Sequence, residues 1–152
     1  MSLEGKLEVE IDIQSSADEF YNLFKSQIYH LPTISSDIIQ KVELHEGDWS
    51  SSDAVKHWNY TLDGKALTVK EKVEVDDENK SITFNIMEGD ILKEFKGFKA
   101  TGQATAKADG SGSTVKWTLD YEKLNEAVAE PKSYTDAIVK ITKDVDAHLL
   151  NA

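Results

Sequence analysis

The side chains best suited to chemistry are a carboxylate and an amine that occur within apolar, strand-like stretches. Glu71 interrupts an alternating apolar series that runs from Leu67 to Val75. A carboxylate on a buried strand face is costly unless it is paired or protonated, and burial raises its pKa. Glu71 is therefore a candidate polar anchor for a ligand, or a candidate general acid. The alternative is a bulge near Lys70 that turns the side chain outward.

Lys56 shares one strand face with Trp58, Tyr60 and Leu62. It is either a cationic or hydrogen-bonding group at a ligand site, or a residue near the strand end that extends its amine to water. Trp58 and Tyr60 carry large amphipathic rings that suit an aromatic or sterol ligand, and core packing explains them equally well. If the protein were an enzyme, Glu71, Lys56 and Tyr60 would form its acid/base set.

Small residues form a row along a later strand face, at Ala100, Gly102 and Ala104. A bulky helix packed closely against the sheet would explain the row, and so would empty volume at the wall of a pocket. A glycine inside a strand often marks the close approach of a ligand or another backbone. We expect the row to form a pocket wall.

Several other chemistries are disfavoured. Among the four histidines none lies three or four residues from another and there is no H-x-H pair, so no metal site is expected, and His45 is expected to make only surface hydrogen bonds. The absence of cysteine excludes disulfides and thiolate ligands. The chain has no GxxxxGK[ST] loop, and no helix is expected after the Gly110–Gly112 turn, so neither suggests a nucleotide site. We expect no catalytic residues and no cofactor.

Length and charge restrict the class of protein further. With 152 residues the chain is expected to form a single domain, 1–152. Its 28 acidic and 17 basic residues give a net charge of −11, which disfavours nucleic acids and anionic membranes. No apolar run approaches the roughly 20 residues of a membrane span. The charged N-terminal residues lack the apolar core of a secretory signal. We expect a cytoplasmic, soluble monomer.

Two helical regions flank a long series of strands. An alternating strand covers residues 7–13, and Ser16 then begins a helix with Glu19 as its capping-box partner. Pro32 is expected to end this helical segment at or before Leu31. Pro131 opens a final helix of about 18 residues, roughly 27 Å long.

The segments between Ile38 and Tyr121 alternate with the period of strands and are separated by short turns, such as 76–80 and 108–112. The final helix has apolar residues at helical spacing from Tyr134 to Leu149, and only the concave face of a sheet offers a surface long enough to cover them. The order of elements predicts an α+β fold with helices on one face of an antiparallel sheet.

Several segments of the chain resemble the plant major latex proteins, the acidic branch of the birch-pollen-allergen (pathogenesis-related class ten) superfamily. The resemblance rests on segments 46–49 (EGDW), 58–65 (WNYTLDGK), 77–84 (DENKSITF), 117–126 (WTLDYEKLNE) and 146–150 (DAHLL). The chain departs from the superfamily in its 46–52 loop, which has Gly47 alone where several glycines are usual, and this puts a phosphate-binding role in doubt. The resemblance implies a helix-grip fold, in which a curved seven-stranded sheet wraps around the long C-terminal helix, with two short helices after the first strand and a cavity between sheet and long helix.

The resemblance also implies a function in binding hydrophobic or amphipathic small molecules such as lipids, steroids, hormones or flavonoids, linked to plant defence and stress. Some members of the superfamily are isomerases or cyclases of specialised metabolism, which is the alternative. The expected ligand-binding residues are Lys56, Trp58, Tyr60, Glu71, Ile82, Phe84, Phe98, Ala100, Gly102, Trp117, Tyr134, Ile138, Ile141 and Val145.

Overall fold

The computed structural model describes residues 3–151. Its elements follow one another as β1 (Glu4–Ile13), α1 (Ala17–Ser26), η1 (Ile28–His30), α2 (Leu31–Ile34), β2 (Ile39–Glu46), β3 (Val55–Leu62), β4 (Lys65–Asp76), β5 (Ser81–Gly89), η2 (Asp90–Lys93), β6 (Phe95–Ala106), β7 (Ser113–Lys123) and α3 (Lys132–Leu150), where η marks a 3₁₀ helix. No helix within 3–151 is both long and apolar enough to cross a lipid bilayer.

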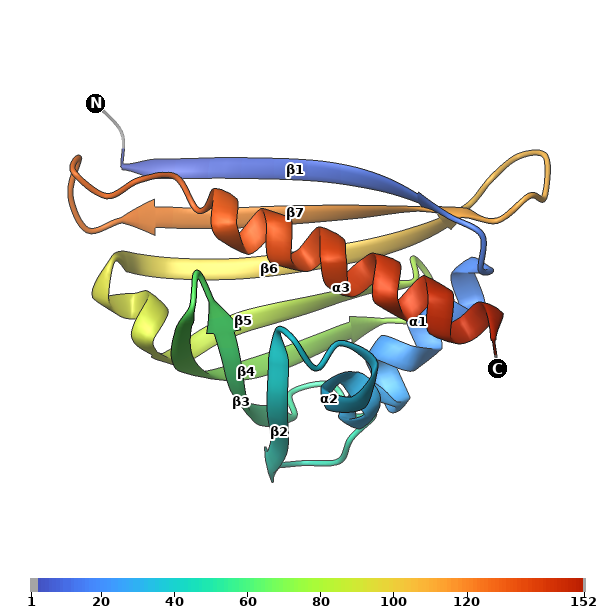
Figure 1. The fold of residues 1–152 in the computed structure, drawn as a ribbon, viewed down its shortest axis with the longest axis horizontal. Helices are drawn as coiled ribbons and strands as arrows, with labels where there is room; N and C mark the ends of the chain where they lie inside the picture. Colours follow the sequence, from blue (N-terminus) through green and yellow to red (C-terminus); the bar gives the residue numbers. More distant parts are fainter. Residues whose placement is uncertain (1–2, 152) are drawn as a thin grey trace.

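The strands form one antiparallel sheet of seven strands in the order β1-β7-β6-β5-β4-β3-β2. The chain therefore runs as a meander from β2 to β7, and the N-terminal strand β1 joins the far edge beside β7. The sheet is strongly curved, and α3 crosses its concave side obliquely (Figure 1). The α+β class, the seven-stranded curved sheet and the two short helices after the first strand are confirmed.

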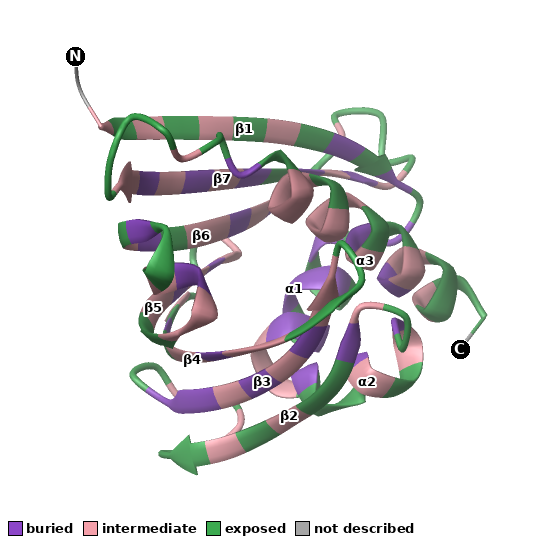
Figure 2. Cartoon of the chain, turned by 60° about the vertical axis from the view of Figure 1, so that its left-hand side comes forward, coloured by how far each residue is buried: buried purple, intermediate pink, exposed green. Residues whose placement is uncertain are grey.

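Alternation along the strands separates a buried face from an exposed one. On β7 the inward positions Val115, Trp117, Leu119 and Tyr121 are all buried, and the residues between them are more exposed. The same alternation is visible along β1 and β7 in Figure 2, whereas β2 at the sheet edge has mostly exposed and intermediate positions. A period of two places one set of side chains over the core because successive strand residues point to opposite faces.

The helical region after β1 differs in one respect from the sequence-based expectation. Ser16 caps α1 as expected, since its hydroxyl accepts a hydrogen bond from the Glu19 backbone N–H at 3.1 Å. The helix that follows Ser16 ends before Leu31, as expected, but Pro32 is not what ends it. The helix α1 already ends at Ser26, and Pro32 lies in the first turn of α2. A proline is tolerated there because the first N–H groups of a helix have no intrahelical acceptor.

The C-terminal half of α3 is fixed to residues that flank α1 and α2. The Asp144 carboxylate accepts a hydrogen bond from the Ser35 hydroxyl at 2.7 Å, and the Asp146 carboxylate accepts one from the Ser15 backbone N–H at 2.9 Å. Val145, between them, is fully buried. By contrast, no residue from 132 to 141 on α3 is fully buried, so the two halves of the helix are held differently.

Candidate functional site

A cavity of about 140 Å³ lies between the concave face of the sheet and the first half of α3. Its walls come from β2 to β7, η2 and α3, and the short helices after β1 close one end. The side chains on its wall are Phe24, Ile28, Leu31, Ile38, Ile39, Trp58, Tyr60, Leu62, Val69, Glu71, Phe84, Ile86, Ile91, Phe98, Ala100, Trp117, Tyr134, Ala137, Ile138 and Ile141.

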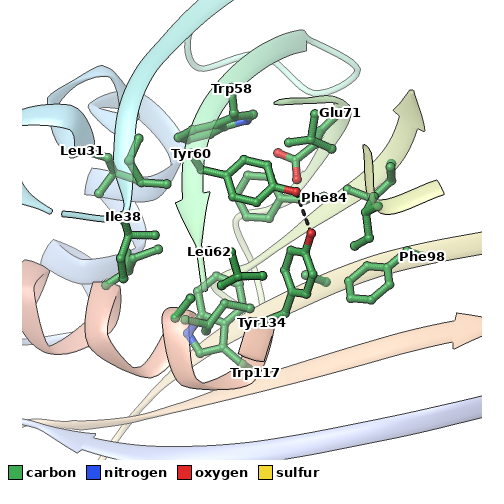
Figure 3. Close-up of a pocket in the computed structure, with 18 of the residues that line it drawn as sticks. Leu31, Ile38, Trp58, Tyr60, Leu62, Glu71, Phe84, Phe98, Trp117 and Tyr134 are labelled. Carbon is green, nitrogen blue, oxygen red and sulfur yellow. Dashed lines mark hydrogen bonds between the residues drawn. The ribbon is translucent and has the colours of Figure 1, made fainter. Parts of the chain in front are cut away.

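Aromatic rings make up much of this wall, as Figure 3 shows. Phe84 stacks on Trp117 with ring centroids 6.4 Å apart, and Phe98 lies against Tyr134 at 5.6 Å. The Trp117 indole N–H donates to the Thr142 hydroxyl at 2.9 Å, so its polar atom is satisfied within the protein. The rings therefore offer a ligand their apolar surfaces.

Two tyrosines connect the sheet to the helix across the cavity. The Tyr60 and Tyr134 hydroxyls are 2.6 Å apart, which joins β3 to the first turn of α3 (Figure 3). Burial raises the pKa of both phenols, and the Tyr60 pKa is raised further by its bond to Tyr134. Both hydroxyls stay protonated at neutral pH and can offer a ligand hydrogen bonds but no charge.

Glu71 is the carboxylate on the cavity wall. The predicted alternative, a bulge that turns Glu71 outward, is wrong. The pairing does shift between Lys70 and Glu71, but the extra residue is Met87 on the partner strand β5, and Glu71 keeps its inward position. Burial raises the pKa of Glu71 to about 8, opposed by the Trp58 indole and by Lys56. The indole N–H lies close to the carboxyl without the distance and angle of a true hydrogen bond.

Lys56 lies directly across the strands from Glu71 but points elsewhere. Its amine donates to the Trp49 backbone carbonyl at 3.0 Å and lies 5.8 Å from the centre of the Trp49 ring. The side chain is fully buried, so the alternative in which it extends to water is wrong. Burial lowers the pKa of Lys56 to about 8, opposed by the charge of Glu71. The loop between β2 and β3 therefore holds this amine behind the cavity wall.

The structure places most of the predicted ligand-binding residues on the cavity wall. They come from β3 to β7 and from the first half of α3, and their contact with a ligand stays a prediction. The residues on the wall are Trp58, Tyr60, Glu71, Phe84, Phe98, Ala100, Trp117, Tyr134, Ile138 and Ile141.

Four predicted residues do not line the cavity. Lys56 is held by the loop carbonyl, and Ile82 is buried in the hydrophobic core. Val145 lies beyond the cavity, in the anchored half of α3. Gly102 lies beneath the Trp117 ring, where an added Cβ would approach the ring to 2.7 Å. Gly102 therefore makes room for the Trp117 ring. Of the row of small residues, only Ala100 lines the cavity.

The sequence analysis missed the end of the cavity that the short helices form. Phe24 and Ile28 belong to an apolar helical stripe that a sequence cannot divide between core and cavity. Leu31 follows them in α2. Ile91, also missed, lies elsewhere on the wall, in the 3₁₀ helix η2 between β5 and β6, which has no periodic signal. Their apolar character could have indicated burial, but not which void they border.

The sequence and the fold both match known proteins. The sequence matches the pathogenesis-related protein Bet v 1 family over residues 2–152. It is 44% identical to MLP-like protein 31 of Arabidopsis thaliana over 151 residues, which cover 99% of this chain and 88% of that protein. The crystal structure of major latex-like protein 151 from Panax ginseng aligns with a TM-score of 0.91 and 39% identity, covering 95% of this chain and 97% of that chain.

A more distant structure shares the fold alone. Norcoclaurine synthase from Thalictrum flavum aligns with a TM-score of 0.84 over 99% of this chain and 89% of that chain, at 17% identity. The chain belongs to the Bet v 1 family, and its helix-grip architecture is that family's fold. Its relatives at about 40% identity are named as major latex proteins or MLP-like proteins, which confirms the resemblance seen in the sequence segments.

Proposed function

We propose that this protein binds a hydrophobic or amphipathic small molecule, of the lipid, steroid, hormone or flavonoid kind, in the cavity between the sheet and α3. The observation that carries the proposal is the character of the cavity wall. Apolar and aromatic side chains form it, and its few polar groups include the Glu71 carboxyl, the Tyr60 and Tyr134 hydroxyls and the Trp58 indole N–H. A largely apolar enclosure with a few directed polar groups is typical of small-molecule sites.

The size of the cavity sets a condition on the ligand. A volume of about 140 Å³ is close to that of an engineered cavity that admits benzene. A single ring therefore fits the cavity as it stands, whereas a sterol or fatty acid requires its wall to move. The first half of α3 is the segment suited to move, since hydrogen bonds at Tyr134 and Ser133 hold it while the second half is anchored in the core.

The proposal also covers the biological role, the cellular compartment and the oligomeric state of the protein. Membership of the family supports a link to defence or stress, and we expect the protein to act as a cytoplasmic monomer. Native mass spectrometry of protein purified from plant tissue tests both the state of assembly and the presence of a bound molecule.

The test of binding uses an uncharged, environment-sensitive probe, N-phenyl-1-naphthylamine. Its fluorescence should rise on binding with Kd of about 1 μM, roughly −8 kcal/mol, and competition with a fatty acid and a sterol should reverse the rise. The probe has three rings and, like both competitors, exceeds the cavity volume, so its binding also requires the wall to move. A one-ring competitor such as phenol fits the cavity as it stands. A folded sample that binds no probe up to about 1 mM would contradict the proposal.

A second candidate function, acid/base catalysis in the same cavity, rests on Glu71. A carboxyl group with a pKa of about 8 is poised to exchange protons near neutral pH. The rest of the predicted acid/base set does not support it. Lys56 bonds to a backbone carbonyl, and the Tyr60 phenol is hydrogen-bonded to Tyr134 with its pKa raised away from neutrality. We therefore favour binding without turnover.

Turnover can be tested with the molecules recovered from the purified protein. Each recovered compound is incubated with catalytic amounts of the wild-type protein and of Glu71→Gln, and the products are analysed by mass spectrometry. A binding protein returns the compound unchanged in both samples. Conversion by the wild type that Glu71→Gln abolishes would establish catalysis instead.

A further inference from the structure

Three metal-ligating side chains meet on the outer face of the sheet, away from the cavity. Glu43 and His45 project from β2, and His57 projects from the neighbouring strand β3. The two residues that flank His57, Lys56 and Trp58, are buried on the concave side, so His57 faces outward. The potential ligand atoms of Glu43, His45 and His57 all lie within 4.8 Å of one another.

We propose that Glu43, His45 and His57 bind a divalent transition-metal ion, and that Zn²⁺ is the cation this group suits. Two imidazole nitrogens and one carboxylate oxygen are ligands that Zn²⁺ prefers, and three protein ligands leave a coordination position open to water or to another molecule. Cations that prefer oxygen alone, such as Mg²⁺ and Ca²⁺, gain less from such a group.

The strand pairing accounts for the convergence. Glu43 and His45 are two residues apart on β2 and so share a face, while Glu43 and His57 are direct cross-strand partners. His45 lies where the β2–β3 pairing shifts by one residue, between Leu44 and Glu46. Such a bulge redirects a side chain locally, and here it brings the His45 ring over His57. The two rings stack with centroids 5.3 Å apart and an angle of 7°.

Metal binding would disturb few existing interactions. The imidazoles of His45 and His57 form no hydrogen bond with any residue from 3 to 151, and the Nδ1 atom of His57 is buried without a partner. Buried polar atoms normally have partners, so this nitrogen requires an explanation. Both rings must turn from their stacked arrangement for their lone pairs to converge. His45 is exposed and free to do so.

Two nearby lysines act against cation binding at this cluster, whereas the overall negative charge of the chain favours it. Lys41 forms an ion pair with Glu43 at 3.5 Å, and Lys70 is the cross-strand partner of His57 on β4. The Lys41–Glu43 pair is well exposed on both sides, so it is weak and can give way to a cation. The net charge of −11 attracts cations to the whole molecule. The test must therefore distinguish this cluster from diffuse attraction to the acidic surface.

Calorimetric titration of the full chain with ZnCl₂, at about 0.15 M salt and with excess Mg²⁺ to occupy oxygen-only sites, makes this distinction. We expect one Zn²⁺ per chain. Removing a ligand through His45→Gln, His57→Gln or Glu43→Gln should weaken binding by at least the roughly 10–100-fold that the loss of a supporting contact costs at metal sites. The matched controls are His30→Gln and His148→Gln, since both histidines are exposed and lie outside the cluster.

A second measurement guards against a folding effect. In NMR spectra of the wild type, Zn²⁺ should shift the imidazole signals of His45 and His57 and leave those of His30 and His148 unchanged. N-phenyl-1-naphthylamine fluorescence, or circular dichroism if the cavity takes no probe, reports whether each variant is folded. The proposal is overturned if the double variant His45→Gln/His57→Gln binds Zn²⁺ as the wild type does, if Mg²⁺ displaces the ion, or if no Zn²⁺ binds.

Discussion

The hydroxyls of Tyr60 and Tyr134, 2.6 Å apart, form a hydrogen bond that holds the first half of α3 against β3 over the cavity. The second half of the same helix is anchored by Asp144 and Asp146, which accept hydrogen bonds from Ser35 and Ser15. A helix whose second half is anchored in the core, and whose first half is held by this bond and by the exposed bond from Ser133 to Asp63, is suited to open at its first half. This arrangement is the physical basis for expecting ligands larger than the cavity.

Tyr134→Phe removes this bond and keeps the ring on the cavity wall. The free energy of unfolding should fall by about 1 kcal/mol, the usual contribution of a hydrogen bond. N-phenyl-1-naphthylamine should both enter and leave faster, because the first half of α3 is held less firmly. Urea denaturation and stopped-flow fluorescence measure the two effects.

The matched control for this change is Tyr21→Phe. The Tyr21 hydroxyl donates to the Asp77 carboxylate at 2.7 Å, and Tyr21 is not part of the cavity wall. Its removal should lower stability without altering the rates of probe binding. Equal rates for Tyr134→Phe and the wild type would show that the tyrosine bond does not control entry.

The fold was largely predictable from the sequence, and the position of the void within it was not. Strand alternation identified Trp58, Glu71 and Trp117 as inward residues because a period of two admits only two faces. The same alternation placed Ala100 and Gly102 on one face, yet the Trp117 ring covers only Gly102. A void remains where the side chains do not fill the space enclosed by the curved sheet and the helix. The periodicity of a sequence gives no measure of that space.

Long-range neighbours explain the other differences between sequence and structure. Lys56 turns toward Trp49, whose carbonyl the β2–β3 loop brings within 3.0 Å. His45 and His57 are twelve positions apart in the sequence but adjacent across two strands, so a search for histidines at helical or H-x-H spacing passes over them. Such pairs can be recognised only when the register of the two strands is known, and the bulge in β2 shifts that register at His45.

Glu71 should make stability depend on pH in a defined window. Its pKa is raised from 4.5 to about 8 in the folded protein, so between these values the folded chain holds a proton that the unfolded chain releases. The contribution of Glu71 to the free energy of unfolding should therefore be greatest below pH 4.5. It should fall as the pH rises to about 8. Glu71→Gln cannot ionise and should remove this fall, which is about 5 kcal/mol across the window at about 1.4 kcal/mol per pH unit.

Urea denaturation of the wild type and Glu71→Gln at several pH values gives the difference directly, and ionisable groups that do not interact with Glu71 cancel between the two proteins. Lys56 acts in the opposite sense. Its pKa is lowered from 10.5 to about 8, so its contribution should raise stability as the pH increases from 8 to 10.5. Parallel stability profiles for the two proteins would mean that Glu71 ionises normally inside the fold.

The anchor of α3 should be sensitive to a single carboxylate. Asp146 accepts hydrogen bonds from the backbone N–H groups of Gln14 and Ser15 and from the Ser15 hydroxyl. Asp146→Ala leaves these donors without their acceptor, and the loss should be about 1–3 kcal/mol in the free energy of unfolding. Asp136→Ala is the control, since Asp136 lies on the same helix and its carboxylate forms no hydrogen bond or ion pair with another described residue. Equal urea midpoints for the two variants would place the anchor elsewhere.

Ala100→Leu and Gly102→Leu should have opposite consequences although the two residues share a strand face. Ala100 lines the cavity, so a leucine there occupies space intended for a ligand and should lower probe affinity by at least about tenfold, or 1.4 kcal/mol. Stability should change little, because filling empty apolar volume recovers about 24 cal/mol per Å³ and offsets local strain. Gly102→Leu meets the Trp117 ring, since even a Cβ would lie 2.7 Å from it, and overpacking should cost roughly 1–3 kcal/mol.

Gly102→Ala separates packing from backbone effects in this comparison. The φ angle of Gly102 does not lie in the left-handed region, so a side chain strains the contact with Trp117 and not the backbone. The alanine variant should therefore lose part of the stability that the leucine variant loses, while Ala100→Leu retains it. Paired urea denaturation and probe titrations decide the matter. If Ala100→Leu binds the probe as the wild type does, the ligand site is not the cavity beneath α3, because the added leucine side chain would occupy part of that cavity.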